Sequence, residues 1–243
     1  MQPYREVPRR SDNLYVVVMT EDTAVTVEGG EVPVVLAKPA KAGPAVVVVP
    51  SIFGIGSDLR AELEGFAEHG AFAASFDPFW RVDPGVVPYS DMARGMERVQ
   101  KMDRARAYQD FLSVIDWLRA EPEVNGHVIG VGICFGGPFC FLAAADGKLN
   151  AVATWHGSRL DGFLDRAQDM KCPMRIHFGD QDPVAPPEVR EKVAGAFAGR
   201  SDVLITLHPG ATHGFSQRDS PAHQPEAHQA AVRSVLELID AAR

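Results

Sequence analysis

The chain has 243 residues, of which 46% are apolar and 23% charged, as in a soluble globular protein with a large buried core. Its formal net charge is -8 and it has no run of five basic residues, which argues against nucleic acid or an anionic membrane as a partner. No apolar stretch approaches the ~20 residues of a membrane span, and the first residues do not resemble a signal peptide. The three cysteines lack the paired spacing of a structural zinc site, and a reducing cytoplasm is the simplest interpretation of so sparse a set.

Short apolar segments alternate with amphipathic ones along the chain, which predicts parallel βα units. The expected strands are residues 15–19, 24–27, 33–37, 45–49, 72–76, 127–132, 151–154, 174–178 and 203–208. The expected helices are residues 58–69, 103–119, a helix from about 135, then 160–168, 187–197 and 223–242. We find no repeat or linker, and we expect one α/β domain over residues 1–243, with a mostly parallel central sheet and helices on both faces.

Residues 77–100 interrupt this alternation with prolines and glycines. The segment follows a strand and therefore lies at the carboxyl edge of the predicted sheet, where open α/β folds place their sites. It is either a surface excursion or a loop that covers the substrate.

A nucleophile motif lies between a strand and a helix. Residues 127–137 read HVIGVGICFGG, in which Gly132, Cys134 and Gly136 form the G-x-nucleophile-x-G elbow with cysteine in the serine position. A side chain at either glycine would collide with neighbouring backbone. The helix amino end favours thiolate over thiol at Cys134, so we predict that this residue is the nucleophile and that Cys140 and Cys172 are structural.

The acid and the base follow in the chain order that this elbow requires. The turn GDQDPVAP after strand 174–178 offers two carboxylates, of which we favour Asp182 over Asp180 as the group that orients the base. His213 lies in the loop after the last strand and is the expected general base. His156, which follows strand 151–154, either lines the rim of the pocket or is structural.

The oxyanion donors are expected to be two backbone amides. The Phe135 amide follows the nucleophile directly, and the Ile52 amide lies in the loop after strand 45–49, from which this type of site draws its second donor.

Together, these segments resemble the dienelactone hydrolase (carboxymethylenebutenolidase) family of the α/β-hydrolase superfamily. The resemblance runs from about residue 30 to the carboxyl end and rests on VVVVPSIFG, DPFWRVDPG, GICFGG, GDQDPVAP and the His213-Gly-Phe segment. It implies a triad of Cys134, His213 and Asp182 that attacks an enol-lactone carbonyl. It also implies that Arg81 binds a substrate carboxylate, a task that suits a bidentate guanidinium.

The sequence departs from the family pattern at two places. Ser51 stands where well-studied members carry a glutamate that takes part in controlling the ionisation of the cysteine. Gln217 stands where the family has a second carboxylate-binding arginine, and Arg218 follows it. We count Ser51, Gln217 and Arg218 with Arg81 as candidate substrate-binding residues.

The sequence therefore predicts a hydrolase that cleaves a small lactone or carboxylic ester through an acyl-cysteine intermediate. No cofactor or metal is expected, and the protein is a monomer or a small homo-oligomer. The alternatives are a general carboxylesterase or thioesterase without dienelactone activity, and a non-catalytic binding protein of the same fold.

Overall fold

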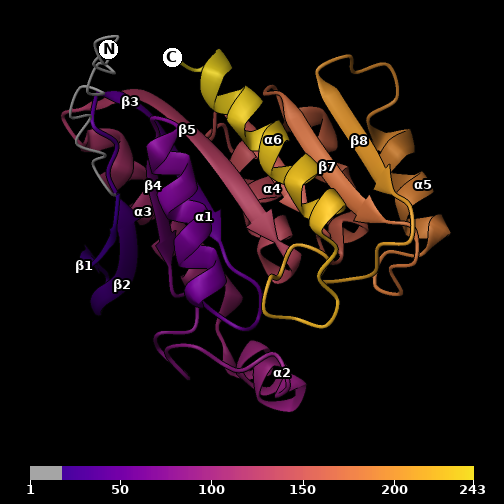
Figure 1. Ribbon diagram of the computed structural model, residues 1–243, viewed down its shortest axis with the longest axis horizontal. Helices are drawn as coiled ribbons and strands as arrows, with labels where there is room; N and C mark the ends of the chain where they lie inside the picture. Colours follow the sequence, from indigo (N-terminus) through magenta and orange to yellow (C-terminus); the bar gives the residue numbers. More distant parts are fainter. Residues whose placement is uncertain (1–17) are drawn as a thin grey trace, which may run out of the picture.

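The computed structural model describes residues 18–243, and the strand expected at 15–19 falls mostly outside this range. Eight strands form one mixed sheet flanked by helices (Figure 1), which confirms the expected α/β architecture. The strands are β1 (Thr20–Val27), β2 (Gly30–Ala37), β3 (Gly43–Val49), β4 (Phe72–Phe76), β5 (Val124–Ile133), β6 (Ala151–Trp155), β7 (Met174–Gly179) and β8 (Val203–His208).

The strands are arranged in the order β1-β2-β4-β3-β5-β6-β7-β8. β1 pairs antiparallel with β2, and β2 pairs antiparallel with β4. From β4 to β8 every neighbouring pair is parallel. The carboxyl ends of these six strands therefore share one edge of the sheet, and the loops that follow them meet there.

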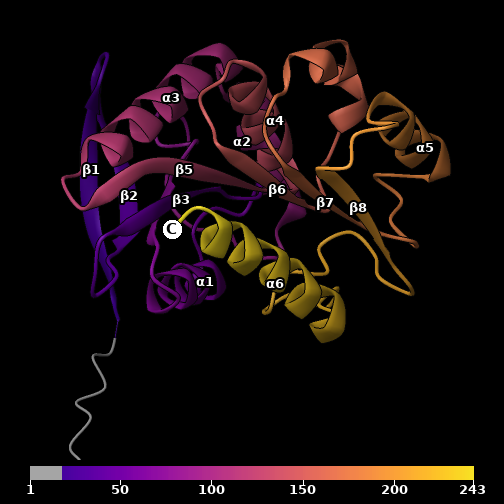
Figure 2. The same ribbon diagram turned by 90° about the horizontal axis from the view of Figure 1, so that it is seen from above.

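Helices cover both faces of the sheet. The helices are α1 (Ser57–Glu68), α2 (Met92–Lys101), α3 (Arg104–Ala120), the 3₁₀ helix η1 (Cys134–Gly136), α4 (Gly137–Ala145), the 3₁₀ helix η2 (Leu160–Asp169), α5 (Pro187–Ala196) and α6 (Pro225–Ala241). Figure 2 shows α1 and α6 on one face, with α3, α4 and α5 on the other. No helix within residues 18–243 is long and apolar enough to cross a membrane.

Burial on both faces of the sheet explains why the central strands are unbroken apolar segments in the sequence. All seven residues of β3 are buried, because helices cover the sheet on both sides. The covering helices bury one stripe each: Leu59, Leu63 and Phe66 of α1 face the sheet at helical spacing.

Helix α2 was not expected from the sequence, which predicted an irregular segment at residues 77–100. The side chain of Asp91 caps its amino end by accepting from the Arg94 amide. The helix has no apolar stripe, and its buried residues are Gly95 and Arg98. An arginine thus anchors α2 below the carboxyl edge of the sheet (Figure 1), where hydrophobic periodicity gives no signal.

Candidate active site

Cys134 lies at the point where β5 ends and η1 begins. Its φ is 53°, a left-handed conformation that non-glycine residues seldom adopt. The turn leaves the side chain 9% exposed at the carboxyl edge of the sheet. Cys140 is fully buried inside α4, and burial raises the pKa of its thiol well above the usual range.

The two flanking glycines let the strand and the helix approach closely. A Cβ atom at Gly132 would lie 2.6 Å from the Gly136 carbonyl oxygen. At Gly136 it would lie 2.2 Å from the Val49 carbonyl oxygen of the neighbouring strand. Both contacts are with backbone that cannot move aside, so the steric argument made for these glycines from the sequence is confirmed.

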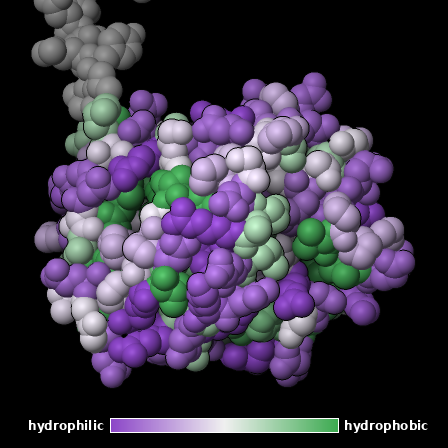
Figure 3. All heavy atoms as spheres, turned by 90° about the horizontal axis from the view of Figure 1, so that it is seen from below, coloured by the Kyte–Doolittle hydropathy of each residue, from purple (hydrophilic) through white to green (hydrophobic). Residues whose placement is uncertain are grey.

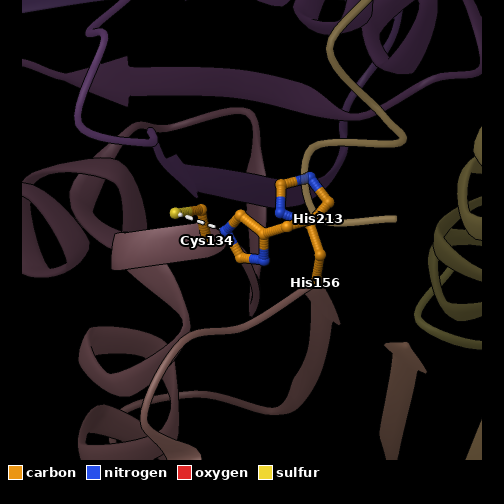
Figure 4. A group of neighbouring side chains, drawn as sticks. All are labelled: Cys134, His156 and His213. Carbon is orange, nitrogen blue, oxygen red and sulfur yellow. Dashed lines mark hydrogen bonds between the residues drawn. The ribbon is translucent and has the colours of Figure 1, made fainter. Parts of the chain in front are cut away.

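Cys134, His213 and Asp182 form one hydrogen-bonded chain. The Cys134 sulfur lies 3.1 Å from His213 Nε2 (Figure 4), and His213 Nδ1 lies 2.8 Å from Asp182 Oδ2. The side chain of Asp182 is fully buried, and its Oδ1 accepts the amides of Val184 and Ala185 at 2.8 and 3.3 Å. Two backbone donors thus fix the carboxylate, which in turn fixes the imidazole.

The loops that carry this acid and base are joined to each other. The Gln181 amide donates to the Ala211 carbonyl at 2.9 Å, and the Asp180 amide donates to His208 at 3.1 Å. Asp180, the second carboxylate of the turn, accepts the Gly210 amide at 2.7 Å and is not hydrogen-bonded to the imidazole. The structure therefore brings Asp182, and not Asp180, to His213.

The charges of this group favour a thiolate–imidazolium pair. Burial alone would raise the pKa of the Cys134 thiol. His213 opposes this through its hydrogen bond and charge, with help from Ser158 and the Phe135 amide, and the net result is a lowered pKa. Burial also disfavours the charged imidazole, but its bonds to Asp182 and Cys134 outweigh this and raise the pKa of His213 to about 10.

Only one of the two expected oxyanion amides has a contact with the sulfur in the structure. The Phe135 amide donates to the Cys134 thiolate. Ile52 lies in the turn after β3, where its amide has no acceptor within residues 18–243. Arg98 of α2 holds this turn: its Nε donates to the Ile52 carbonyl at 2.7 Å, and its Nη1 donates to the Gly85 carbonyl at 2.8 Å.

His156 contributes a second buried imidazole to the site. Its ring meets that of His213 edge to face at 4.9 Å, and its Nε2 lies 2.8 Å from Ser216 Oγ. Burial, followed by the charge of His213, lowers its pKa well below the ordinary value, so this ring is neutral. One ligand atom each from Cys134, His156 and His213 lie within 4.8 Å of one another. Such a set can coordinate a soft divalent cation, although the sulfur and His213 Nε2 are already hydrogen-bonded to each other.

Arg81 is engaged within the protein. Its Nε and Nη2 donate to the two oxygens of the buried Asp110 at 3.2 and 3.0 Å, and Nη2 also donates to the Glu28 carbonyl at 2.8 Å. The guanidinium stacks on the Trp80 ring at 3.9 Å. These contacts tie the loop after β4 to α3 and to the β1–β2 turn. They leave Nη1 as the one nitrogen without a partner among the described residues.

The other three candidate binding residues gather near α1. Ser51 and Gln217 are buried and line the same small cavity, together with the buried Glu62 of α1. Arg218 forms an ion pair with Glu62, which His228 also contacts at 3.1 Å. Ser51 Oγ accepts the Phe53 amide at 3.3 Å and so supports the turn that carries Ile52.

Besides Arg98, one contributor to the site was missed from the sequence, namely Ser158. Ser158 Oγ lies 3.4 Å from the Cys134 sulfur, and its amide donates to the Cys134 carbonyl at 3.0 Å. Its position just after β6, at the carboxyl edge of the sheet, was the available signal.

A cavity of about 530 Å³ opens beside the turn that follows β3. Phe53, Tyr89 and residues 86–88 form its apolar side, and Asp58 and Asp219 supply carboxylates on the α1 side. Tyr89 and Asp58 are hydrogen-bonded at 2.5 Å. Figure 3 views the molecule from the side on which α2 lies and shows hydrophobic patches separated by hydrophilic side chains.

Sequence comparison finds relatives in one family of hydrolases. A sequence model of the dienelactone hydrolase family matches residues 32–242. The carboxymethylenebutenolidase of a Pseudomonas species is 29% identical, over 91% of this chain and 95% of its own. That of Pseudomonas putida is 26% identical, over 86% of this chain and 92% of its own.

Solved structures agree on the fold. A dienelactone hydrolase-like promiscuous phosphotriesterase from metagenomic libraries superposes with a TM-score of 0.78, at 23% identity over 93% of this chain and 99% of its own. The dienelactone hydrolase of Anabaena variabilis gives 0.69, at 18% identity over 91% and 96%. These similarities confirm the α/β-hydrolase fold expected from the sequence.

Proposed function

The chain belongs to the dienelactone hydrolase family, whose members hydrolyse lactones and esters, and we propose that Cys134 performs this reaction as the nucleophile. The observation that carries the proposal is the continuous hydrogen-bonded chain from the sulfur through His213 to Asp182. This chain supplies a nucleophile, a proton carrier and a fixed counter-charge in one geometry.

In the acylation step, the Cys134 thiolate attacks the carbonyl carbon of the ester or lactone and forms an S–C bond. The Ile52 and Phe135 amides donate hydrogen bonds to the resulting oxyanion. The tetrahedral intermediate then collapses and the C–O bond breaks. The leaving oxygen takes its proton from the His213 imidazolium, whose raised pKa keeps that proton available at neutral pH.

In the deacylation step, water attacks the thioester. His213, now neutral, takes a proton from the water, and Asp182 stabilises the imidazolium that forms. The S–C bond breaks, the carboxylic acid leaves, and the thiolate–imidazolium pair is restored. Every proton moves between the substrate, water and His213, so the protein returns to its starting state.

The direct test compares two buried cysteines. Cys134→Ala should lower kcat/KM for a neutral activated aryl ester by a factor on the order of 10³ or more, because the nearby Ser158 hydroxyl is hydrogen-bonded to Cys134 and not to the base His213. Cys140→Ala is the matched control, since its thiol is inert inside α4. Wild-type hydrolysis by Cys134→Ala would end the proposal.

A general carboxylesterase or thioesterase remains the second candidate. It is favoured by the engagement of Arg81 with Asp110, because a dienelactone carries a carboxylate that the family pattern assigns to this arginine. If Arg81→Ala lowers kcat/KM equally for a carboxylate-bearing lactone and its neutral methyl ester, Arg81 does not read the carboxylate. A loss confined to the anionic lactone would show that it does.

We further propose that the substrate is a small molecule and that the protein acts as a monomer or a small homo-oligomer in the cytoplasm, without a metal or cofactor. The fold and the family support the first of these statements. Gel filtration at two protein concentrations tests the oligomeric state, and metal analysis of the purified active protein tests the last.

A further inference from the structure

Two arginines lie beside the nucleophile without a polar partner. Within residues 18–243, all but three arginine side chains form a hydrogen bond or an ion pair with the protein. The three exceptions among these residues are Arg104, Arg159 and Arg233. Arg233 lies on α6, away from the nucleophile elbow, whereas the other two flank it. Both residues of this flanking pair are exposed.

The backbone fixes each member of the pair relative to Cys134. Arg159 directly follows Ser158, which contacts the sulfur at 3.4 Å and bonds the Cys134 carbonyl through its amide. Arg104 is the first residue of α3, and its guanidinium carbon lies 5.5 Å from the centre of the Phe135 ring. Phe135 follows the nucleophile and carries one of the proposed oxyanion amides.

Neither arginine of the pair forms an ion pair with the described residues. Burial and then the charge of Arg159 lower the pKa of Arg104. Arg104 is the first residue of α3, and the Asp103 carboxylate that caps this helix accepts the Arg106 amide at 3.0 Å and is not paired with Arg104. Each guanidinium therefore keeps its hydrogen-bond donors for an anion from solution.

The cavity beside the turn after β3 has the opposite charge. Asp58 of α1 and Asp219, which precedes α6, line this cavity on the α1–α6 face of the sheet. Helix α3, which begins at Arg104, lies on the other face (Figure 2), and η2, which Arg159 precedes, packs against α4 of that face. Of these two sides, the α3–α4 side is the one that favours an anionic group on a substrate.

We propose that Arg104 and Arg159 bind a carboxylate on the ester or lactone substrate, on the α3–α4 side of the Cys134 sulfur. This proposal rests on the proposed function, because it concerns the substrate of the same site. It assigns the binding of the substrate carboxylate to residues other than Arg81. A guanidinium group matches a carboxylate in shape and charge, and each of the two arginines offers it a charge-assisted hydrogen bond.

The first test needs no turnover. Cys134 is alkylated with iodoacetate, which is an anion, and with iodoacetamide, which is neutral and of nearly the same size. The ratio of the two rate constants, measured by peptide mass spectrometry, cancels any change in thiolate reactivity. We expect this ratio to fall about tenfold in Arg104→Gln combined with Arg159→Gln, and to fall in the wild type as salt screens the pair.

The second test uses hydrolysis. The ratio of kcat/KM for a carboxylate-bearing aryl ester to that for its methyl ester should fall about tenfold for each substitution, the loss of one charge-assisted hydrogen bond. Arg233→Gln, the partnerless arginine on α6, is the matched control and should leave both ratios as in the wild type.

The outcomes separate the two proposals. If the double variant keeps the wild-type alkylation ratio, or if Arg233→Gln lowers that ratio as much, the arginine pair does not bind anions and this inference is overturned. If the ratio falls but the wild type hydrolyses neither ester, the pair binds anions and the proposed function is the part that fails.

Discussion

Replacing Asp182 by asparagine should disable the base while leaving the fold intact. The Val184 and Ala185 amides fix one carboxylate oxygen at 2.8 and 3.3 Å, so an asparagine must place its carbonyl oxygen there. Its NH₂ group then faces His213 Nδ1, which lies 2.8 Å from Asp182 Oδ2 in the wild type. An NH₂ group cannot accept the imidazole proton, so the ring is held in the wrong tautomer.

The size of the effect follows from the contact that is lost. A hydrogen bond to a charged group contributes about 1.5–3 kcal/mol, and each 1.4 kcal/mol is tenfold in rate. The wrong tautomer adds to this, and in serine triads the same exchange costs ~10⁴ in kcat. We therefore expect Asp182→Asn to lower kcat/KM by about 10² or more. The high-pH limb of the profile, set by the raised pKa of His213 near 10, should also move to lower pH, because a stabilising negative charge is removed.

The assay is kcat/KM for a neutral aryl ester as a function of pH, with Asp180→Asn as the control. Asp180 lies two residues away and accepts only a backbone amide, a role that asparagine retains. We expect it to stay within about threefold of the wild type. The reasoning is refuted if Asp182→Asn is as active as the wild type, or if Asp180→Asn loses as much activity.

Further predictions concern the charge pair, the elbow and the buried arginine. Because the pKa of His213 is raised to about 10, the imidazolium keeps its proton below that pH. On the alkaline side, kcat/KM should therefore fall only as the pH rises through about 10. A fall as the pH rises through 6.5, the ordinary pKa of histidine, would contradict this prediction. Gly136→Ala drives a Cβ into a β3 carbonyl and should lower the free energy of unfolding by about 1–3 kcal/mol in urea titrations. Gly162→Ala, with open space at its Cβ, should be nearly neutral, and equal losses would refute the steric argument. Arg98→Met leaves the Ile52 and Gly85 carbonyls without their donors. It should lower the free energy of unfolding by about 2–4 kcal/mol and kcat by at least about tenfold. Arg94→Met on the same helix breaks an exposed pair and should cost under about 1 kcal/mol, so similar losses in both would contradict a positioning role for Arg98.

The regular part of the fold was predictable because periodicity reports burial directly. Strands β4 and β8 match their expected limits, and α1 is shifted by one residue. The 3₁₀ helices η1 and η2 were expected as helical stretches of unspecified type. Helix α2 was not predicted, because a buried arginine and not an apolar stripe holds it in place.

The candidate site was predictable where chain order and local motif coincide. Cys134 and its flanking glycines form a motif that is recognisable by itself. The positions of Asp182 and His213 follow from the strands that precede them. The long side chains could not be placed from sequence. Arg81 resembles a substrate ligand in its motif but pairs with Asp110, an α3 residue 29 positions away. Arg104 reaches the elbow only because α3 packs beside it.

Detection of the covalent acyl-cysteine intermediate is the most direct test of the proposed mechanism. The wild type is mixed with a slowly deacylated ester, quenched in acid and digested, and the peptide that contains Cys134 is examined by mass spectrometry. The mass of the acyl group is expected on Cys134 and on neither Cys140 nor Cys172. Turnover with no acyl group on Cys134, or with the acyl group on another residue, would contradict the proposed mechanism.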